Sequence, residues 1–407
     1  MLKKSSFFNF WYFGLLSGLL LAVTVIAYIV YKVSWGFGFG IVTVAMAIAT
    51  VVFLYGTPFY RHKLPGGSPI TSIAQVVVAA IRKRNISMPS DVSLLYEDRD
   101  VESIKSESIK PGQRHLSHTD NFQFLDKAAI MVQNSSEWNT DTQGSAKPNP
   151  WKVCTVTQVE ETKLILRMVP IWFSSLTFGL AAVSQNATFF IRQGHTMDRS
   201  MGSHFKIPAV SLGVFSTIFG LAFVIIYDRC MVPLARRITG NERGITVLQR
   251  IGIGLFFSLL CMVIAALTEK KRIHAAETHG LLDSPTTTIP MSAFWLVPQF
   301  VLAGIADVFT LVGLQEYFYN EAPDSMRSLG IAFYVSVLGV ASFLNGLVIT
   351  LVESMSKRGG HEGWLVNNLN RCKLEYFYWL LAIFSAINLC CYVFIANIYN
   401  YKKVNRT

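Results

Sequence analysis

One carboxylate stands inside an apolar stretch that is long enough to cross a membrane. The stretch covers residues 291–317, and Asp307 lies in it between Ala306 and Val308. About 20 apolar residues span a bilayer as a helix. A charge at membrane depth costs at least ~2.5–3.5 kcal/mol on insertion scales, so such a residue usually faces a cavity or a partner. We therefore expect Asp307 to line a solute or proton path; a structural ion pair or a protonated, hydrogen-bonded carboxyl is the alternative.

Other residues of the same stretch suit a polar helix that moves. Gln299 precedes Asp307 by about two helical turns, which places both on roughly the same face of a helix. Pro298 and Gly304 permit a bend. Glu316 follows at the expected inner end of the span, where a salt bridge is the simplest interpretation.

The composition indicates a membrane protein. Of 407 residues, 52% are hydrophobic and only 15% are charged, which is too few for the surface of a soluble globule. The net charge of +11 fits basic cytoplasmic loops and anionic lipid headgroups better than nucleic-acid binding. The six cysteines form no CxxC pair and no zinc-like spacing with histidine, so we expect unpaired packing thiols. The histidines are scattered through loops and termini. A membrane-embedded enzyme, a metal and a cofactor are therefore not expected.

Eight membrane spans are predicted, in a group of two and a group of six. Basic residues stand before and after the first pair, so both of its ends are expected in the cytoplasm. The first run is longer than the core of a signal peptide. The fold class is an all-α polytopic membrane protein with both termini cytoplasmic. Residues 269–272 are charged and fall on the expected outer face, although basic residues next to a span usually lie on the cytoplasmic side. The predicted spans are residues 7–31, 39–54, 163–185, 208–227, 251–267, 291–317, 329–352 and 376–398.

A long polar region separates the two groups of spans. It opens with SPITSIAQVVVAAIRKRN at residues 68–85, whose apolar residues form one face of a predicted helix. We expect this helix to lie laterally at the membrane surface. The remainder has mixed charges and many serines and asparagines, which is typical of a partly disordered cytoplasmic connector.

Long segments of the chain resemble the plant nitrate/peptide transporter family, whose members are proton-dependent oligopeptide transporter relatives in the major facilitator superfamily. WKVCTVTQVEETKLILRMVPIW (151–172) resembles the start of the family's seventh helix, and FFNFWYFGLLSGLL (7–20) resembles the fifth. HFKIPAVSLGVF, YDRCMVPLARRITGNERGITVLQRIGIGLFFS, FWLVPQFVLAGIADVFTLVGLQEYFY and SMRSLGIAFYVSVLGVASFLNGL resemble helices eight to eleven, and LNRCKLEYFYWLLA resembles the start of the twelfth. The resemblance covers nearly the whole chain.

The resemblance implies a major facilitator fold that lacks its first four helices. In the family, twelve helices flank a long cytoplasmic loop, six on each side. By this comparison, residues 1–60 are a two-helix remnant of the N-terminal bundle. Residues 61–163 are the cytoplasmic loop with its lateral amphipathic helix, and residues 164–407 are the C-terminal six-helix bundle. The Glu-x-x-Glu-Arg motif of the first helix, which the family links to proton coupling, is missing, as is the fourth-helix lysine that pairs with the position matched by Asp307. Many relatives have glutamate at that position.

The resemblance also implies further cavity positions in the second half. Some nitrate-transporting relatives have a histidine two residues before the position of Gln185, where this chain has Val183, so anion binding by that histidine is unsupported. The two aromatic positions fit packing as well as they fit a cavity. The candidate solute and proton pathway comprises Asp307, Gln299, Arg167, Trp172, Gln185, Phe215 and Phe343.

Two functional hypotheses follow. The first is a secondary active transporter that couples protons to symport of nitrate, small peptides or another small solute across the plasma or vacuolar membrane. The second is a truncated family member that does not transport and acts as an interaction or non-functional product. A homo-oligomer could complete a cavity. The cavity residues do not choose between nitrate, dipeptides, hormones and glucosides.

Overall fold

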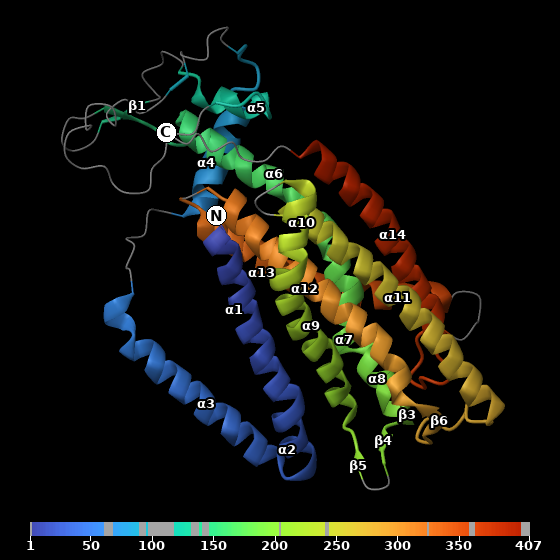
Figure 1. Ribbon diagram of the computed structural model, residues 1–407. Coiled ribbons are helices and arrows are strands. Elements are labelled where there is room, and N and C mark those ends of the chain that lie inside the picture. The colour runs from blue at the N-terminus through green and yellow to red at the C-terminus, as the bar shows by residue number, and fades with distance from the viewer. Residues whose placement is uncertain are drawn as a thin grey trace. The chain divides into compact units, whose positions relative to one another are not determined.

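The part of the chain that the structure describes is mostly helical (Figure 1). The computed structural model describes residues 2–60, 68–88, 95–96, 118–131, 138–140, 146–202, 205–240, 244–323, 325–357 and 363–399. The helices are α1 (Leu2–Leu21), α2 (Ala27–Lys32), α3 (Trp35–Tyr55), α4 (Pro69–Arg82), α5 (Gln123–Asp126), α6 (Val156–Phe178), α7 (Ser184–Ala187), α8 (Phe189–Thr196), α9 (Val214–Ile226), α10 (Val232–Thr239), α11 (Val247–Thr278), α12 (Val297–Glu321), α13 (Arg327–Ser356) and α14 (Leu374–Ile398).

Short turns and strands connect these helices. Five-residue π-helical turns at Ala22–Ile26, Gly179–Val183 and Tyr227–Met231 join α1 to α2, α6 to α7 and α9 to α10. The 3₁₀ turns are Thr57–Phe59, Lys127–Ala129, Ala209–Gly213 and Ala293–Leu296. Antiparallel pairs form between β1 (Trp138–Thr140) and β2 (Ala146–Pro148), and between β4 (Ser200–Met201) and β5 (Phe205–Lys206). β3 (Met197–Asp198) pairs in parallel with β6 (Ile289–Ser292).

The described residues contain eight helices that are long and apolar enough to cross a membrane, as predicted. The predicted arrangement of two spans, a long connection and six spans is confirmed. The eight spans are Asn9–Lys32, Trp35–Tyr55, Val156–Ala181, Ala209–Ile238, Val247–Thr278, Ala293–Glu321, Arg327–Ser356 and Leu374–Ile398.

The fifth span, α11, is longer at its C-terminal end than predicted. It begins at a capping box in which Thr246 and Gln249 bond each other's backbone N–H groups, at 2.9 and 3.2 Å. It then continues to Thr278 and not to residue 267. Residues 269–272, predicted to follow the span, are therefore part of the helix. The helix continues because Glu269 and Arg272 pair with each other and are both buried.

The chain divides into two compact units. The first comprises residues 1–61, 171–317 and 334–399, and the second comprises residues 62–170, 318–333 and 400–407. The division into three regions at residues 60 and 163 stays a prediction.

In the first unit, α12 packs closely against both α9 and α11 because glycines stand at the contacts. A Cβ atom at Gly304 would overlap the backbone carbonyl of Ser216 in α9. A Cβ atom at Gly254 of α11 would overlap the hydroxyl and backbone of Thr310 in α12. These contacts lie within one turn of Asp307 on each side along α12, so they fix the backbone that carries this residue.

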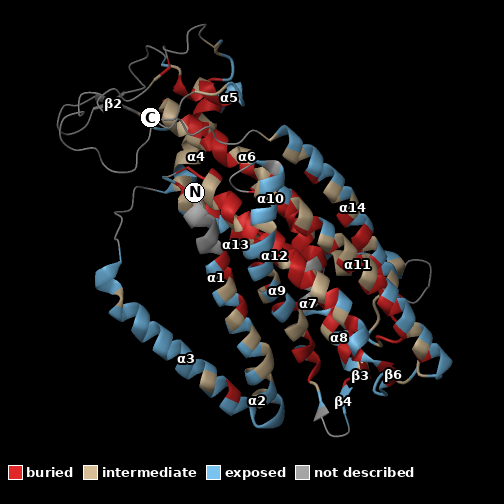
Figure 2. Cartoon of the chain, viewed as in Figure 1, coloured by how far each residue is buried: buried red, intermediate tan, exposed pale blue. Residues whose placement is uncertain are grey.

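The first two spans of this unit differ in how they are packed. α1 lies against α9, where Leu16 approaches Gly220. In the turns that adjoin these helices, Ser211 donates a hydrogen bond to the Val23 carbonyl at 2.9 Å. α3 contacts α2, and most of its side chains are exposed, as the pale blue of α3 in Figure 2 shows. In each of these two spans only 6% of the apolar window is buried, which fits helices whose surfaces are available to lipid.

The second unit has its own apolar core around α4. The helix predicted at residues 68–85 is present, with Pro69 in its first turn, where the fixed backbone angle of proline suits a helix start. Its residues Val76, Ala79 and Ala80 are buried against protein. Its placement on a membrane surface stays a prediction. The core residues from the other segments are Leu95, Leu125, Ala128, Ala129, Cys154 and Val159.

Replacing Gly304 with alanine should destabilise the protein by about 1–3 kcal/mol, because an added methyl group in a filled contact forces the backbones apart. Gly339 of α13 is the matched control, since nothing lies within 4 Å of a Cβ placed there. Thermal unfolding in detergent should show a lower midpoint for Gly304→Ala and an unchanged or higher one for Gly339→Ala. Equal midpoints in the two variants would contradict the close contact.

Candidate functional site

Asp307 lies half-buried at the centre of the 29-residue span Ala293–Glu321. Its Oδ1 atom is shielded from solvent and receives no hydrogen bond from any residue that the structure describes. Three residues from other helices interact electrostatically with Asp307. They are Tyr12 of α1, Cys261 of α11 and Tyr334 of α13. A shielded carboxylate oxygen without a donor costs free energy, so this arrangement is typical of a functional group.

Two of the candidate residues at the start of the second group of helices are bonded to α13. Gln185 is fully buried and donates from Nε2 to Asn345 Oδ1 at 2.8 Å and to the Leu180 carbonyl at 3.1 Å. Its Oε1 atom is buried without a hydrogen bond from the described residues. Trp172 donates from its indole nitrogen to Ser336 Oγ at 2.8 Å.

Gln299 belongs to a buried polar network that joins α8, α11, α12 and α14. It donates to Gln193 Oε1 at 3.2 Å, and Tyr378 donates to the same oxygen at 3.1 Å. Gln193 in turn donates to Glu269 Oε2 at 2.6 Å. The Gln299 Oε1 atom is buried and has no donor within the described part of the chain.

Glu269 and Arg272 form the charged centre of this network. Two nitrogens of Arg272 donate to the two Glu269 oxygens at 2.8 and 2.7 Å, in the bidentate geometry that suits arginine and carboxylate. Arg272 also donates to Asn370 Oδ1 at 2.9 Å and to the Leu369 carbonyl at 2.9 Å. Neither charged side chain is exposed. The remaining hydrogen bonds satisfy the guanidinium, which a buried ion pair requires.

A second charged cluster lies at the other end of α11. Arg250 donates to Asn9 Oδ1 at 3.1 Å, and Asn9 donates to Asp228 Oδ1 at 2.6 Å. The guanidinium carbon lies 4.2 Å from the centre of the Tyr227 ring, a cation–π distance. Glu316 forms the expected salt bridge, with its Oε2 atom 3.9 Å from Arg250 Nη1.

In the second unit, Lys163 of α6 binds residues 118–131, which are called segment 118–131 below. Its ammonium donates to Glu160 Oε1 at 2.8 Å and to the Thr119 carbonyl at 2.7 Å, and it pairs with Asp126 Oδ1 at 2.7 Å. The candidate residue Arg167 donates to Thr119 Oγ1 at 3.1 Å.

This cluster contains a set of metal-ligand types, His118, Asp126 and Glu160, whose ligand atoms lie within 4.8 Å of one another. The ammonium of Lys163 is bonded to both carboxylates. The lysine therefore places one positive charge between the two carboxylates, at the point where a metal ion would have to bind.

The candidate aromatics differ from the polar residues. Phe215 is partly buried and packs edge-on against Phe294, with ring centres 6.0 Å apart, as expected for packing. Phe343 is 84% exposed on α13. The structure thus links Gln185 and Trp172 to one helix and assigns Gln299 to a separate network, while Arg167 belongs to the other unit.

Several residues of the site were not identified from the sequence. Glu269 and Arg272 carry a signal, since opposite charges three residues apart face each other on a helix. No such sequence signal exists for Gln193, Tyr12 and Tyr334, because each of them interacts with a residue that is remote in the sequence. The complete set that sequence reasoning missed is Tyr12, Gln193, Glu269, Arg272, Tyr334 and Asn345.

Eight apolar helices, buried charge pairs and a central carboxylate whose Oδ1 atom receives no hydrogen bond from the described residues define an integral multi-pass membrane protein. A family model described as PTR2, the POT family, matches residues 2–365. The NRT1/PTR family 5.7 protein of Arabidopsis thaliana is 49% identical over 402 residues, which are 98% of this chain and 64% of that protein. The family 5.4 protein of the same plant is 47% identical over 406 residues, covering 98% of this chain and 70% of that protein.

Solved structures agree with this assignment at the level of the fold. An auto-inhibited POT family peptide transporter aligns with a TM-score of 0.58 and 17% identity, over 100% of this chain and 72% of that one. The POT family transporter PepTSo aligns with a TM-score of 0.59 and 16% identity, over 97% and 72%. The chain therefore belongs to the POT family, a family of transporters and not of enzymes. It spans about two thirds of the length of the curated relatives it matches, 64% and 70% in these two cases.

Removing one partner of the Glu269–Arg272 pair should destabilise the protein by about 3–5 kcal/mol, because the other charge stays buried and unpaired. Arg272→Met and Glu269→Gln test this by unfolding in detergent micelles. Glu277→Gln, at an exposed position of the same helix, should change stability by less than about 0.5 kcal/mol. The double variant should lose less than the sum of the two single losses. Additive losses would show that the two side chains act separately.

Replacing Lys163 with methionine should loosen segment 118–131 from α6, because Asp126 and Glu160 then lose their shared cation. Cys154 reports this change, since it packs in the same unit. Burial raises the pKa of the Cys154 thiol to about 11, so little reactive thiolate exists near neutral pH. Alkylation of Cys154 by iodoacetamide, followed by mass spectrometry, should be faster in Lys163→Met than in the wild type.

The control for this experiment is Lys357→Met. It removes an exposed ion pair with Glu353, which contributes little to stability. The Cys154 alkylation rate in this control should equal that of the wild type. An unchanged rate in Lys163→Met would contradict the role of the lysine.

Proposed function

We propose that the protein serves in proton-coupled symport of a small solute, such as nitrate or a short peptide. The observation that carries the proposal is the shielded Oδ1 atom of Asp307, which lies at the centre of its span and receives no hydrogen bond from the described residues. A carboxyl group in that position can carry a proton across the apolar layer in its neutral form. A counter-ion would remove this capacity by holding the group ionised.

Secondary transporters place their substrate and ion sites near the bilayer midplane, on helices that rock as bundles. The central position of Asp307 on α12 fits this rule. The buried amide oxygens of Gln185 and Gln299, which also lack donors among the described residues, offer further hydrogen-bond acceptors. Such acceptors suit a solute with N–H groups, such as a peptide. One of the structurally similar proteins is a peptide transporter, which supports the same substrate class.

The alternative is that the 407-residue chain does not transport by itself. A rocking mechanism needs two bundles around one cavity. In α13, only 17% of the apolar window is buried, and Phe343 is largely exposed. Much of the apolar surface of this helix is therefore available for packing against another bundle. A second copy of the chain could cover it.

The test is uptake by the purified 407-residue chain in liposomes, driven by an inward proton gradient. Labelled dipeptide and labelled nitrate should be tried in parallel. We expect Asp307→Asn to abolish accumulation against a gradient while it retains exchange of solute across the membrane without a gradient, because only the proton step needs the carboxyl. Asp307→Glu should keep both activities, and Glu277→Gln is the control at an exposed position.

Two outcomes would contradict the proposal. Gradient-driven accumulation by Asp307→Asn at the wild-type rate would exclude the proton role of Asp307. If the wild-type chain is folded in the liposomes but takes up neither solute, the non-transporting alternative is supported.

A further inference from the structure

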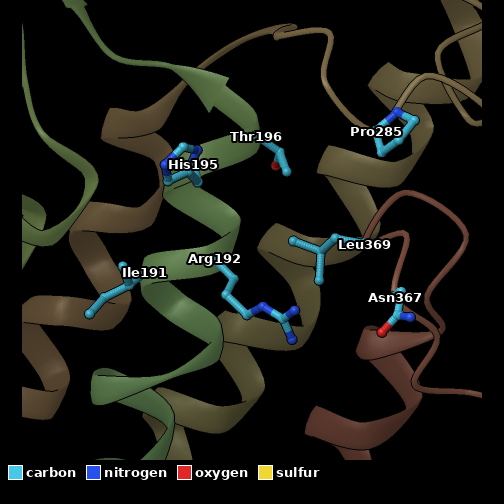
Figure 3. A pocket seen from close by; sticks show the side chains of 7 residues that line it. All are labelled: Ile191, Arg192, His195, Thr196, Pro285, Asn367 and Leu369. Carbon is cyan, nitrogen blue, oxygen red and sulfur yellow. The ribbon is translucent and has the colours of Figure 1, made fainter.

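A pocket of about 280 Å³ opens beside α8, at the same end of the first unit as the Glu269–Arg272 pair. Figure 3 shows α8 on one side of it and two loops on the other, with the Arg192 side chain extending toward Leu369 and Asn367. The pocket combines a polar set of side chains with a smaller apolar set. It is lined by Ile191, Arg192, His195, Thr196, Pro285, Asn367 and Leu369.

The polar groups of this pocket are rich in donors and include no carboxylate among the described lining residues. Arg192 is exposed, and its guanidinium makes no hydrogen bond within the described part of the chain. Two acidic groups in the adjoining described segments are already engaged. Asp283 pairs with Arg371, and Glu269 is saturated by Arg272 and Gln193. The arginine thus brings a positive charge into the pocket without a partner there.

The walls of the pocket are fixed by hydrogen bonds behind them. Arg272 donates to Thr196 Oγ1 at 3.2 Å and to the Leu369 carbonyl at 2.9 Å, so one buried side chain holds two of the lining residues. Asn368 and Asn370 donate to the carbonyls of Leu282 and Leu281, at 2.8 and 3.0 Å. These bonds tie the loop before α14 to the loop that carries Pro285. A pocket that is held in place in this way loses little entropy when a ligand binds.

We propose that this pocket binds a small organic carboxylate through Arg192. The planar guanidinium offers two parallel N–H groups to a carboxylate, and this bidentate geometry distinguishes planar oxoanions from a spherical anion such as chloride. The amide of Asn367 and the ring of His195 can add hydrogen bonds. Ile191, Pro285 and Leu369 form an apolar wall for a short hydrocarbon chain.

The volume sets the size of the ligand. Pockets for drug-sized molecules measure about 300–1,000 Å³, so this one suits a carboxylate of a few carbon atoms. The site is separate from Asp307 and does not rest on the proposed transport function. Its ligand need not be the transported solute.

The experiment measures thermal stabilisation of the purified full chain in nanodiscs by sodium butyrate, with sodium chloride at equal ionic strength as the reference. A ligand that binds only the folded state raises the midpoint with concentration, and the titration gives an apparent Kd. We expect Arg192→Gln to weaken butyrate binding by about tenfold or more, since charge-assisted hydrogen bonds are strong. Arg192→Lys should also weaken it, because lysine keeps the charge but loses the bidentate geometry.

Lys270→Gln is the matched control, since it removes an exposed positive charge at the same end of the unit without touching the pocket. It should leave the apparent Kd unchanged. Arg192→Gln should keep the wild-type midpoint without ligand, because the arginine makes no hydrogen bond in the described structure. Unaltered affinity in Arg192→Gln, or an equal loss in Lys270→Gln, would overturn the proposal. Asp307→Asn should bind butyrate like the wild type; a loss there would place the carboxylate at the central site and overturn the assignment to this pocket.

Discussion

The free-energy cost of putting a charge into apolar surroundings determines how this protein is built. Each buried charge needs an opposite charge or a full set of hydrogen bonds, since an uncompensated one would outweigh many packing contacts. Glu269 and Arg272 satisfy each other, Lys163 is shared between two carboxylates, and Arg250 lies over an aromatic ring. Asp307 is the contrasting case, with one shielded oxygen that has no donor in the described structure.

The same paired charges determine which helices are joined. Arg250 and Arg272 stand near opposite ends of α11, and each binds residues from other parts of the sequence. Between them, close contacts at Gly254 and Gly304 hold α12 against its neighbours. The carboxyl of Asp307 is therefore carried by a helix that is fixed at its middle. Close packing of this kind favours a motion in which α11 and α12 move together.

The sequence predicts the spans well because length and apolar content alone decide whether a helix can cross a membrane. The same reasoning ends α11 too early, because it treats Glu269 and Arg272 as two separate charges that are unfavourable in a membrane. In the folded protein they form one neutral ion pair. Asp307 is recognisable because its charge is out of place in its own stretch. The hydrogen bond from Gln185 to Asn345 is not predictable in this way, because it depends on how two helices turn toward each other across 160 residues of sequence.

The π-helical turns have a consequence for how the spans work as moving parts. Each such turn accommodates one residue more than an α-helical turn, so everything beyond it is rotated by roughly 100° relative to an unbroken α-helix. Gln185 lies two residues past the turn at Gly179–Val183, and Arg236 follows the turn at Tyr227–Met231. If the extra residue migrates along the helix or is expelled at its end, the side chains between the old and the new position change faces without any unfolding. Such a shift in any of these three spans would turn the affected side chains toward a different neighbour while the helix stays hydrogen-bonded.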